Sequence, residues 1–385
     1  MHIKDQVLSV FKQQYGTPTL AVRAPGRINL IGEHTDYNHG FVTPAAIDKA
    51  MYFCFSPSDE PALNIFAFNL NVRASISLAS DFVLRHSWQD YFSAVLAVLH
   101  ERGLKPANGL NIAFGGDIPN GGGLSSSAAL CCGFIFGLNT LFGWPLTRLD
   151  MAKIAQLAEH KIGTNCGIMD MFASLFGKAN HVIRLDCRDM SYDYFPLELG
   201  EYELVLINTK VKHALADSAY NSRRNDCETA LAVFQQHESN VQTLRDVDEA
   251  MIEKYKNQLT DYQYKRVIFV VQEEARVRKA TAALQANDLV TVGQCMFEAH
   301  VGLSQVYEVS CPELDLLVEL AKSKTGVLGA RMMGGGFGGC TINIIQKSKT
   351  AQILEELSAA YNQKFGWKPE PIFVTIQDGV GVVNI

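Results

Sequence analysis

The chain has 385 residues, of which 48% are hydrophobic and 19% charged, and its formal net charge at pH 7 is −6. A chain of this length and composition can bury one large core or two. Its Lys and Arg residues are scattered rather than clustered, which argues against nucleic acid as the main partner. No apolar run approaches the roughly 18 residues that span a bilayer, so we expect no membrane partner.

Two features predict a cytoplasmic protein. The first residues, MHIKD, lack the apolar stretch of a secretory signal, so we expect no such signal. The nine cysteines include no C-x-x-C pair, and most stand among apolar residues, as Cys131 and Cys132 do. This pattern indicates reduced core thiols rather than a disulfide framework or a zinc site.

Hydrophobic periodicity predicts alternating helices and strands along the first half of the chain. The spacing of Val7, Val10 and Phe11 predicts a helix within the first fifteen residues. Further helices are predicted at residues 91–98, 128–142 and 150–161. Strand patterns occupy residues 20–31, 63–78, 110–114, 182–185 and 204–207.

The second half of the chain begins with a mainly helical pattern, from about residue 220 to residue 300. A strand is then predicted at residues 341–345, a helix at 351–365 and a strand at 372–376. A soft boundary near residues 190–220 divides the chain into an N-terminal domain, 1–200, and a C-terminal domain, 201–385. No Pro/Gly/Ser-rich linker marks this boundary, so we expect the two halves to pack closely.

The first motif is RAPGRINLIGEHTDYN, residues 23–38, which holds four polar side chains within ten residues: Arg27, Glu33, His34 and Asp36. One proline and two glycines punctuate it, which predicts strand and turn rather than helix. Carboxylates accept hydrogen bonds from hydroxyls, and His and Arg donate them. The cluster therefore suits a pocket for a small polyhydroxylated ligand, although a surface loop could carry the same residues.

The second motif is IPNGGGLSSSAA, residues 118–129, between a predicted strand and an apolar helix. Three glycines and three serines at a helix N-terminus favour a bound anion, because the backbone N–H groups there are free. The structural alternative is a Gly-rich turn that is capped by Ser. The motif is not a Walker A loop, since it lacks the Lys.

The third motif is GARMMGGGFGGC, residues 329–340, in which Gly334, Gly336 and Gly339 satisfy G-x-G-x-x-G. A dinucleotide-binding fingerprint of this kind has to open a helix. Residues 340–345 instead alternate polar and apolar like a strand. We therefore reject a dinucleotide-binding function for this segment.

Taken together, the three motifs resemble one family. Residues 26–37, GRINLIGEHTDY, closely resemble the signature of galactokinases, which belong to the GHMP small-molecule kinases. The second motif is similar to the GHMP phosphate loop, and the third to the glycine loop that supports the phosphate site, with Met333 where galactokinases usually carry Thr. The resemblance implies the α+β, two-domain GHMP kinase fold: an N-terminal α/β domain with a left-handed crossover, a C-terminal α+β domain, and the active site in the cleft between them.

The resemblance also implies the catalytic residues. Residues 163–170, GTNCGIMD, resemble the galactokinase segment that carries the catalytic Asp, which makes Asp170 the base. Arg27 would be the neighbouring cation that stabilises charge on the transferring phosphoryl group. Without the resemblance, Asp170 would be interpreted as an ordinary carboxylate at a helix N-terminus.

By the same resemblance, galactose would be bound by Glu33, His34, Asp36, Gly167 and Tyr220. Many relatives carry Glu where this chain has Ala219. ATP would lie on the phosphate loop and, through a W-x-x-Y pattern, beside Trp88; the loop residues are Gly121, Gly122, Gly123, Leu124, Ser125, Ser126 and Ser127. Mg²⁺ would be held by Ser127 and Glu159, with His160 as the alternative if the alignment slips by one residue.

The function implied is ATP-dependent phosphorylation of galactose at its anomeric C1 hydroxyl, the first step of the Leloir pathway, by a monomer. Two alternatives stay open. One is a sibling kinase for N-acetylgalactosamine or arabinose, and the other is a non-catalytic galactose and ATP sensor of the same fold. Such sensors can lose residues of the Ser-Ser-Ser-Ala stretch. Here that stretch is intact, which favours an enzyme.

Overall fold

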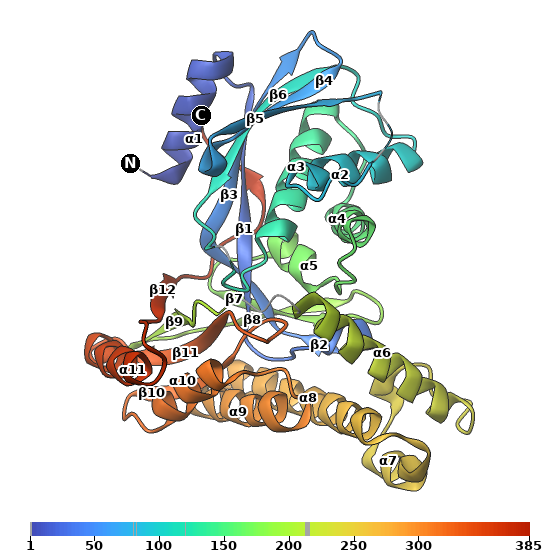
Figure 1. The fold of residues 1–385 in the computed structure, drawn as a ribbon, viewed down its shortest axis with the longest axis vertical. Helices are drawn as coiled ribbons and strands as arrows, with labels where there is room; N and C mark the ends of the chain where they lie inside the picture. Colours follow the sequence, from blue (N-terminus) through green and yellow to red (C-terminus); the bar gives the residue numbers. More distant parts are fainter. Residues whose placement is uncertain (1, 80, 82, 120, 212–215) are drawn as a thin grey trace.

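The computed structural model describes residues 2–79, 81, 83–119, 121–211 and 216–385 (Figure 1). Its largest sheet has six strands in the order β13-β1-β3-β6-β4-β5. Strands β4 and β6 run parallel, and β5 and a helix lie between them in the chain, whereas the neighbouring pairs are antiparallel. The strands are β1 (Leu20–Asn29), β3 (Pro44–Ser58), β4 (Ala62–Ala67), β5 (Val72–Ser77), β6 (Gly109–Gly116) and β13 (Gly381–Val382).

Helices cover both faces of this sheet (Figure 1). Helix α1 (Ile3–Tyr15) packs on β3 and β6 through Val7 and Phe11, which are fully buried. The opposite face carries α3 (Ser126–Phe142), an apolar helix that packs on β1 and β3. Burial of these apolar side chains supplies most of the driving force for folding. The other helices on this side are α2 (Gln89–Glu101), α4 (Arg148–Ile162) and α5 (Met169–Phe176).

Two smaller sheets complete the strand framework of the described chain. A four-stranded sheet has the order β10-β11-β9-β12, and a three-stranded sheet has the order β2-β7-β8. Their strands are β2 (Phe41–Val42), β7 (His181–Asp186), β8 (Tyr192–Pro196), β9 (Tyr202–Asn208), β10 (Val327–Met332), β11 (Cys340–Gln346) and β12 (Glu370–Val374).

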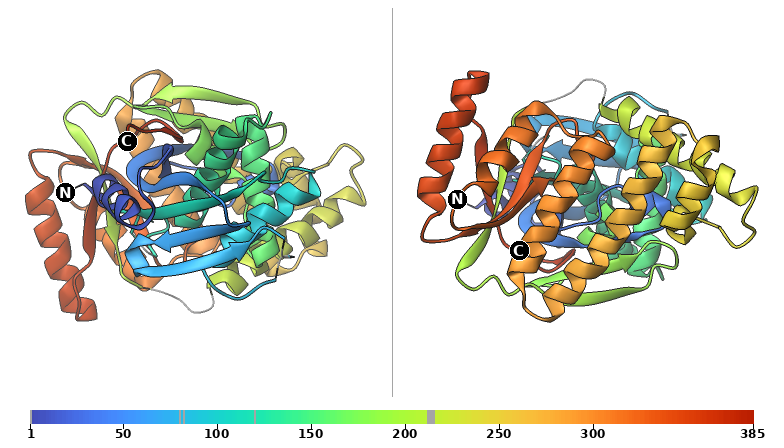
Figure 2. Two further views of the ribbon diagram at one scale, coloured as in Figure 1. Left: turned by 90° about the horizontal axis from the view of Figure 1, so that it is seen from above. Right: turned by 90° about the horizontal axis from the view of Figure 1, so that it is seen from below.

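Three helices cover these sheets from below, as the right-hand view of Figure 2 shows: α8 (Asp261–Gln285), α9 (Leu289–Val301) and α10 (Pro312–Lys322). Helix α11 (Thr350–Phe365) packs on the four-stranded sheet. Helices α6 (Ala216–Gln235) and α7 (Glu249–Tyr255) pack against α8. Short helical turns complete the described chain: η1 (Asp36–Asn38), η2 (Phe68–Leu70), η3 (Leu244–Asp246), η4 (Lys256–Gln258) and η5 (Gly302–Val306). No helix in the described ranges is long and apolar enough to cross a membrane.

The helices and strands predicted from periodicity are confirmed, and the third motif leads into strand β11 rather than a helix, as expected. The periodicity analysis missed β3, a central strand that is mostly buried and contains Pro44, Asp48 and Lys49. A strand buried on both faces need not alternate polar and apolar residues. The domain boundary near residue 200 stays a prediction; β13 pairs with β1, so the end of the chain returns to the first sheet.

Candidate active site

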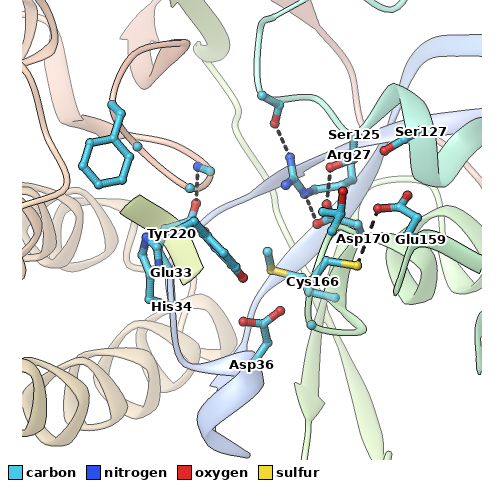
Figure 3. Close-up of a pocket in the computed structure, with 18 residues that line it drawn as sticks. Arg27, Glu33, His34, Asp36, Ser125, Ser127, Glu159, Cys166, Asp170 and Tyr220 are labelled. Atoms are coloured by element: carbon cyan, nitrogen blue, oxygen red, sulfur yellow. Dashed lines mark hydrogen bonds and ion pairs between the residues drawn. The ribbon is translucent and has the colours of Figure 1, made fainter. Parts of the chain in front are cut away.

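A cavity of about 280 Å³ lies where the three sequence motifs meet (Figure 3). Loops after β1 and before α3 form two of its walls, and the ends of α4 and α5, helix α6 and the β10–β11 connection complete it. Eleven of the residues predicted from the sequence line it: Arg27, Glu33, His34, Asp36, Gly123, Ser125, Ser127, Glu159, Gly167, Asp170 and Tyr220.

Asp170 receives two hydrogen bonds within this cavity. The guanidinium Nε of Arg27 donates to its Oδ1 at 2.7 Å, and the Ser125 hydroxyl donates to its Oδ2 at 2.5 Å. A second nitrogen of Arg27 donates to the carbonyl of Gly123. Burial lowers the pKa of the Arg27 guanidinium, but the charges of Asp170 and Glu33 outweigh burial, and the net shift is upward. Arg27 therefore stays positively charged beside the phosphate loop.

A β-bulge places Arg27 at this point. Pro25 pairs with Ala50 and Arg27 with Ala46, so three residues of β3, 47–49, face one residue of β1, and an irregularity of this kind re-aims the side chains beside it. Gly26 is needed at the bulge, because a Cβ there would lie 2.7 Å from the carbonyl oxygen of Leu124. The Arg27 N–H donates to that same carbonyl at 3.2 Å. The strand and the phosphate loop are thus joined directly.

The phosphate loop turns through left-handed backbone conformations at Gly121, Gly123 and Ser125, with φ of 73°, 69° and 57°. Helix α3 then starts at Ser126 without a side-chain cap, because the Ser125 hydroxyl bonds to Asp170 instead. The N–H groups of the first helical turn are therefore not capped by that hydroxyl. Together with the helix dipole they form a site that suits an anion.

Glu159 ends in the same cavity, from the last turn of α4. It is buried, its Oε1 has no hydrogen-bond partner among the described residues, and its Oε2 accepts from the Cys166 thiol at 3.5 Å. Burial and the charge of Asp170 raise its pKa to about 7, while Ser127 and Cys166 act in the opposite direction. His160 instead bonds to the carbonyl of Cys166 and faces a different cavity.

The oxygen atoms of Glu159 and Ser127 suit Mg²⁺ as ligands. The partnerless oxygen of Glu159 and the nearby hydroxyl of Ser127 are hard oxygen ligands, which Mg²⁺ prefers. No group of three or more His, Cys, Asp or Glu suited to a metal occurs in the described part of the chain. Mg²⁺ commonly takes one or two protein ligands and completes its shell with phosphate oxygens and water.

The opposite side of the cavity carries Glu33 and His34. Glu33 Oε1 accepts from Arg331 at 3.1 Å and from the Gly334 N–H at 2.8 Å. His34 has a left-handed backbone, with φ of 62°, and its Nδ1 lies 2.8 Å from the Tyr37 hydroxyl. Burial lowers the pKa of His34 to about 3, so the ring is neutral at physiological pH.

Asp36, Gly167 and Tyr220 complete this side. A Cβ on Gly167 would lie 1.7 Å from Asp36 Oδ2, so only glycine leaves room for that carboxylate. Burial and the charges of Asp170 and Glu33 raise the pKa of Asp36 to about 7. The rings of Tyr220 and His34 are 5.4 Å apart. Carboxylates, an imidazole and a phenol thus surround one small polar space (Figure 3).

Five predicted residues lie outside the cavity lining: Trp88, Gly121, Gly122, Leu124 and Ser126. Trp88 packs against Phe114 and Phe92, two buried residues in the core beside the six-stranded sheet, with ring centroids 5.5 and 5.9 Å away. Leu124 is buried and contributes its carbonyl to Arg27.

Two of the residues to which the sequence analysis assigned no role make contacts that hold the site. Arg331 is fully buried on β10 and binds Glu33 as well as the carbonyls of Asn29 and Leu30. Cys166 lines the cavity and bonds to Glu159. Both stand inside motifs that were noted. The partners of Arg331 are distant in sequence, and Glu159, although close to Cys166 in the chain, lies outside its motif, so the motifs alone gave the two residues no role.

Three family models match separate segments of the chain. Residues 9–57 match the galactokinase galactose-binding signature, residues 90–178 the GHMP kinases N terminal domain, and residues 280–363 the GHMP kinases C terminal. A galactokinase of Clostridium beijerinckii is 40% identical over 361 residues, which cover 92% of each chain. One of Clostridium acetobutylicum is 38% identical and covers 99% of this chain and 98% of its own.

The chain belongs to the galactokinase family. A crystal structure of Lactococcus lactis galactokinase complexed with galactose superposes with a TM-score of 0.94, at 30% identity, over 98% of this chain and 99% of that one. A mevalonate kinase of Methanococcus jannaschii, 17% identical, has a TM-score of 0.66 over 94% of this chain and 100% of its own. The second likeness concerns the fold alone. The predicted family and the predicted GHMP kinase fold are confirmed.

Proposed function

We propose that this galactokinase-family protein transfers the γ-phosphoryl group of ATP to the anomeric C1 hydroxyl of galactose, giving galactose 1-phosphate and ADP. The observation that carries the proposal is the Arg27–Asp170 pair, which lies between the phosphate loop and the polar sugar-signature residues. A base beside a fixed cation, between an anion site and a hydroxyl-binding site, suits phosphoryl transfer to an alcohol.

In the proposed reaction, the C1 oxygen attacks the γ-phosphorus and the bond from that phosphorus to the bridging β–γ oxygen breaks. The hydroxyl proton passes to the Asp170 carboxylate, and ADP leaves with the bridging oxygen. Arg27 holds Asp170 in place through the 2.7 Å contact and supplies positive charge near the equatorial oxygens of the transferring group. Ser125 orients the second carboxylate oxygen.

ATP is proposed to place its phosphates at the N-terminus of α3, over the loop that contains Gly121, Gly123 and Ser125. Ser127 and Glu159 would hold Mg²⁺, which neutralises phosphate charge when bound. The loop lacks the Lys of a Walker A motif, so the helix N-terminus and the ion share that task. The adenine contact of Trp88 stays a prediction.

Galactose is proposed to lie against Glu33, His34, Asp36, Gly167 and Tyr220. Support comes from their position around one cavity and from the relative whose structure was solved with galactose. The two carboxylates accept from sugar hydroxyls, and a sugar that lacks the matching hydroxyl leaves a buried carboxylate unpaired and is strongly disfavoured. We also propose that the protein works in the cytoplasm as a monomer, in the first step of the Leloir pathway.

The alternatives are a sibling sugar kinase and a sugar sensor without catalysis. Asp170, Arg27 and the Ser-Ser-Ser-Ala stretch are all present, which favours an enzyme. ADP release should be measured with galactose, N-acetylgalactosamine, arabinose and glucose in the presence of MgATP. The proposal predicts the highest kcat/KM for galactose. A higher value for another sugar would identify a sibling kinase, and galactose binding without turnover would identify a sensor.

A further inference from the structure

The loop between β1 and β2 carries three of the proposed galactose-binding side chains. Two side chains of helix α8, more than 200 residues later in the chain, accept hydrogen bonds from the two ends of this loop. At one end the Gly32 N–H donates to Glu273 Oε1 at 2.9 Å. At the other end the Phe41 N–H donates to Glu274 Oε1 at 2.8 Å. Both glutamates come from adjacent positions of α8, which packs against β2.

Both glutamates are buried, which is costly for a carboxylate unless its oxygens are paired. Glu273 has an exposed fraction of 0% and also accepts from Arg276 Nε at 2.6 Å. Glu274 has an exposed fraction of 6%, and its Oε2 has no hydrogen-bond partner in the described chain. Burial raises the pKa of Glu274 to about 7. Burial of the Glu274 carboxyl group is unfavourable for folding, so we expect a structural role that offsets this cost.

The loop is shaped around these two carboxylates. A Cβ on Gly40 would lie 1.8 Å from Glu274 Oε1, so glycine lets the carboxylate reach the Phe41 N–H. Gly32 has a left-handed backbone, with φ of 96°. Between them the Thr35 hydroxyl lies 2.9 Å from the Gly32 carbonyl and 2.7 Å from that of Phe41. The loop ends are thus fixed from inside by Thr35 and from outside by α8.

We infer that Glu273 and Glu274 are positioning residues that set the galactose-binding loop by holding its two end amides. The inference rests on the proposed function and deepens it. Neither glutamate lines the cavity, so each acts through the loop that carries Glu33, His34 and Asp36. The phosphate loop is held by other contacts. Loss of either hydrogen bond, from Gly32 to Glu273 or from Phe41 to Glu274, should therefore raise the galactose KM and leave the ATP KM within about twofold of wild type.

Positions 273 and 274 differ in whether a negative charge is needed, because Glu273 pairs with Arg276 and Glu274 has no such partner in the described chain. This difference gives a matched pair of tests. Glu274→Gln keeps an oxygen acceptor for Phe41 and removes only the ionisable group, so the galactose KM should stay within about twofold of wild type. Glu274→Ala removes the acceptor and should raise that KM about tenfold. At position 273 both Gln and Ala should raise it, because Glu273 accepts from the Gly32 N–H and from Arg276 with separate oxygens, and a Gln can offer its one oxygen to only one of these donors.

Hydrogen exchange tests these two hydrogen bonds without any substrate. In Glu274→Ala the Phe41 amide should exchange at least about tenfold faster, and in Glu273→Ala the Gly32 amide should do so. Asp48→Ala is the control: Asp48 Oδ1 also accepts a backbone N–H, from Thr375 at 2.9 Å, and lies outside the cavity lining. That variant should change neither amide nor the galactose KM.

Gly40→Ala provides a second route if an alanine variant at 273 or 274 fails to fold. Its new Cβ should displace the Glu274 carboxylate, raise the galactose KM and speed exchange at Phe41. In the double variant with Glu274→Ala the two effects should be less than additive. Unchanged exchange at both amides, or equal rises in the galactose and ATP KM, would overturn the inference. Absence of galactose turnover in the wild type would instead overturn the proposed function and leave the exchange result standing.

Discussion

Arg27 and Asp170 are 143 residues apart in the chain, yet Arg27 Nε lies 2.7 Å from Asp170 Oδ1 at the centre of the cavity. Arg27 stands beside the irregular pairing of β1 with β3, and Asp170 in the first turn of α5. The phosphate loop adds Ser125 on the second carboxylate oxygen. The proposed base, its neighbouring cation and the proposed phosphate site are thus linked by hydrogen bonds, and the proposed catalysis depends on these contacts.

Asp170→Asn should lower kcat by roughly 100- to 10,000-fold, because it removes the proton acceptor and the charge that pairs with Arg27. Galactose binding, measured by calorimetry, should remain detectable. Ser125→Ala should lower kcat less, since Arg27 still holds the carboxylate. Turnover of Asp170→Asn within a few-fold of wild type would refute the role of base.

Asp36→Ala should raise the galactose KM by at least about tenfold and change the ATP KM little, because a buried acceptor for a sugar hydroxyl is lost. Steady-state kinetics with each substrate varied in turn measures both values. Gly167→Ala should act in the same direction, since its Cβ would occupy the space of the Asp36 carboxylate. Equal changes in both KM values, together with a lower Tm, would indicate a general folding defect instead.

Glu159→Gln should raise the Mg²⁺ concentration needed for half-maximal rate, because it replaces a carboxylate oxygen with a weaker ligand. Excess Mg²⁺ should partly restore turnover. Galactose affinity without nucleotide should be unchanged. An unaltered Mg²⁺ titration in a folded variant would move the ligand to another residue, with His160 the first to consider.

The pH dependence of stability should change in Glu274→Gln. The pKa of Glu274 is raised from 4.5 to about 7, mainly by burial; Arg245 and Arg278 oppose the shift and Glu273 adds to it. The stability contributed by this group is therefore fully present below pH 4.5 and is lost as the pH rises through 7. Gln cannot ionise. Relative to its value at low pH, the free energy of unfolding of the variant should therefore rise by up to about 3 kcal/mol over that of the wild type above pH 8. Thermal melts of both proteins from pH 5 to 8.5 test this, and a Tm difference that does not change with pH would contradict it.

The local motifs and the α+β pattern could be predicted from the sequence, because glycine spacing and hydrophobic period are local properties. The contacts that hold the site together could not. Arg331 reaches Glu33, and Glu273 reaches Gly32, across more than half of the chain, and no local pattern links these partners. The nucleotide contact suggested by the W-x-x-Y pattern at Trp88 stays a prediction; the ring of this partly buried residue packs against Phe114.

The most direct test of the central claim is the position of the phosphate in the product. Purified protein should be incubated with MgATP and galactose, and the product analysed by ³¹P–¹H correlation NMR. The account predicts a single sugar phosphate whose phosphorus couples to the anomeric proton at C1, formed by the wild type and lost in Asp170→Asn. Phosphate on another sugar carbon, or equal product from both proteins, would contradict it.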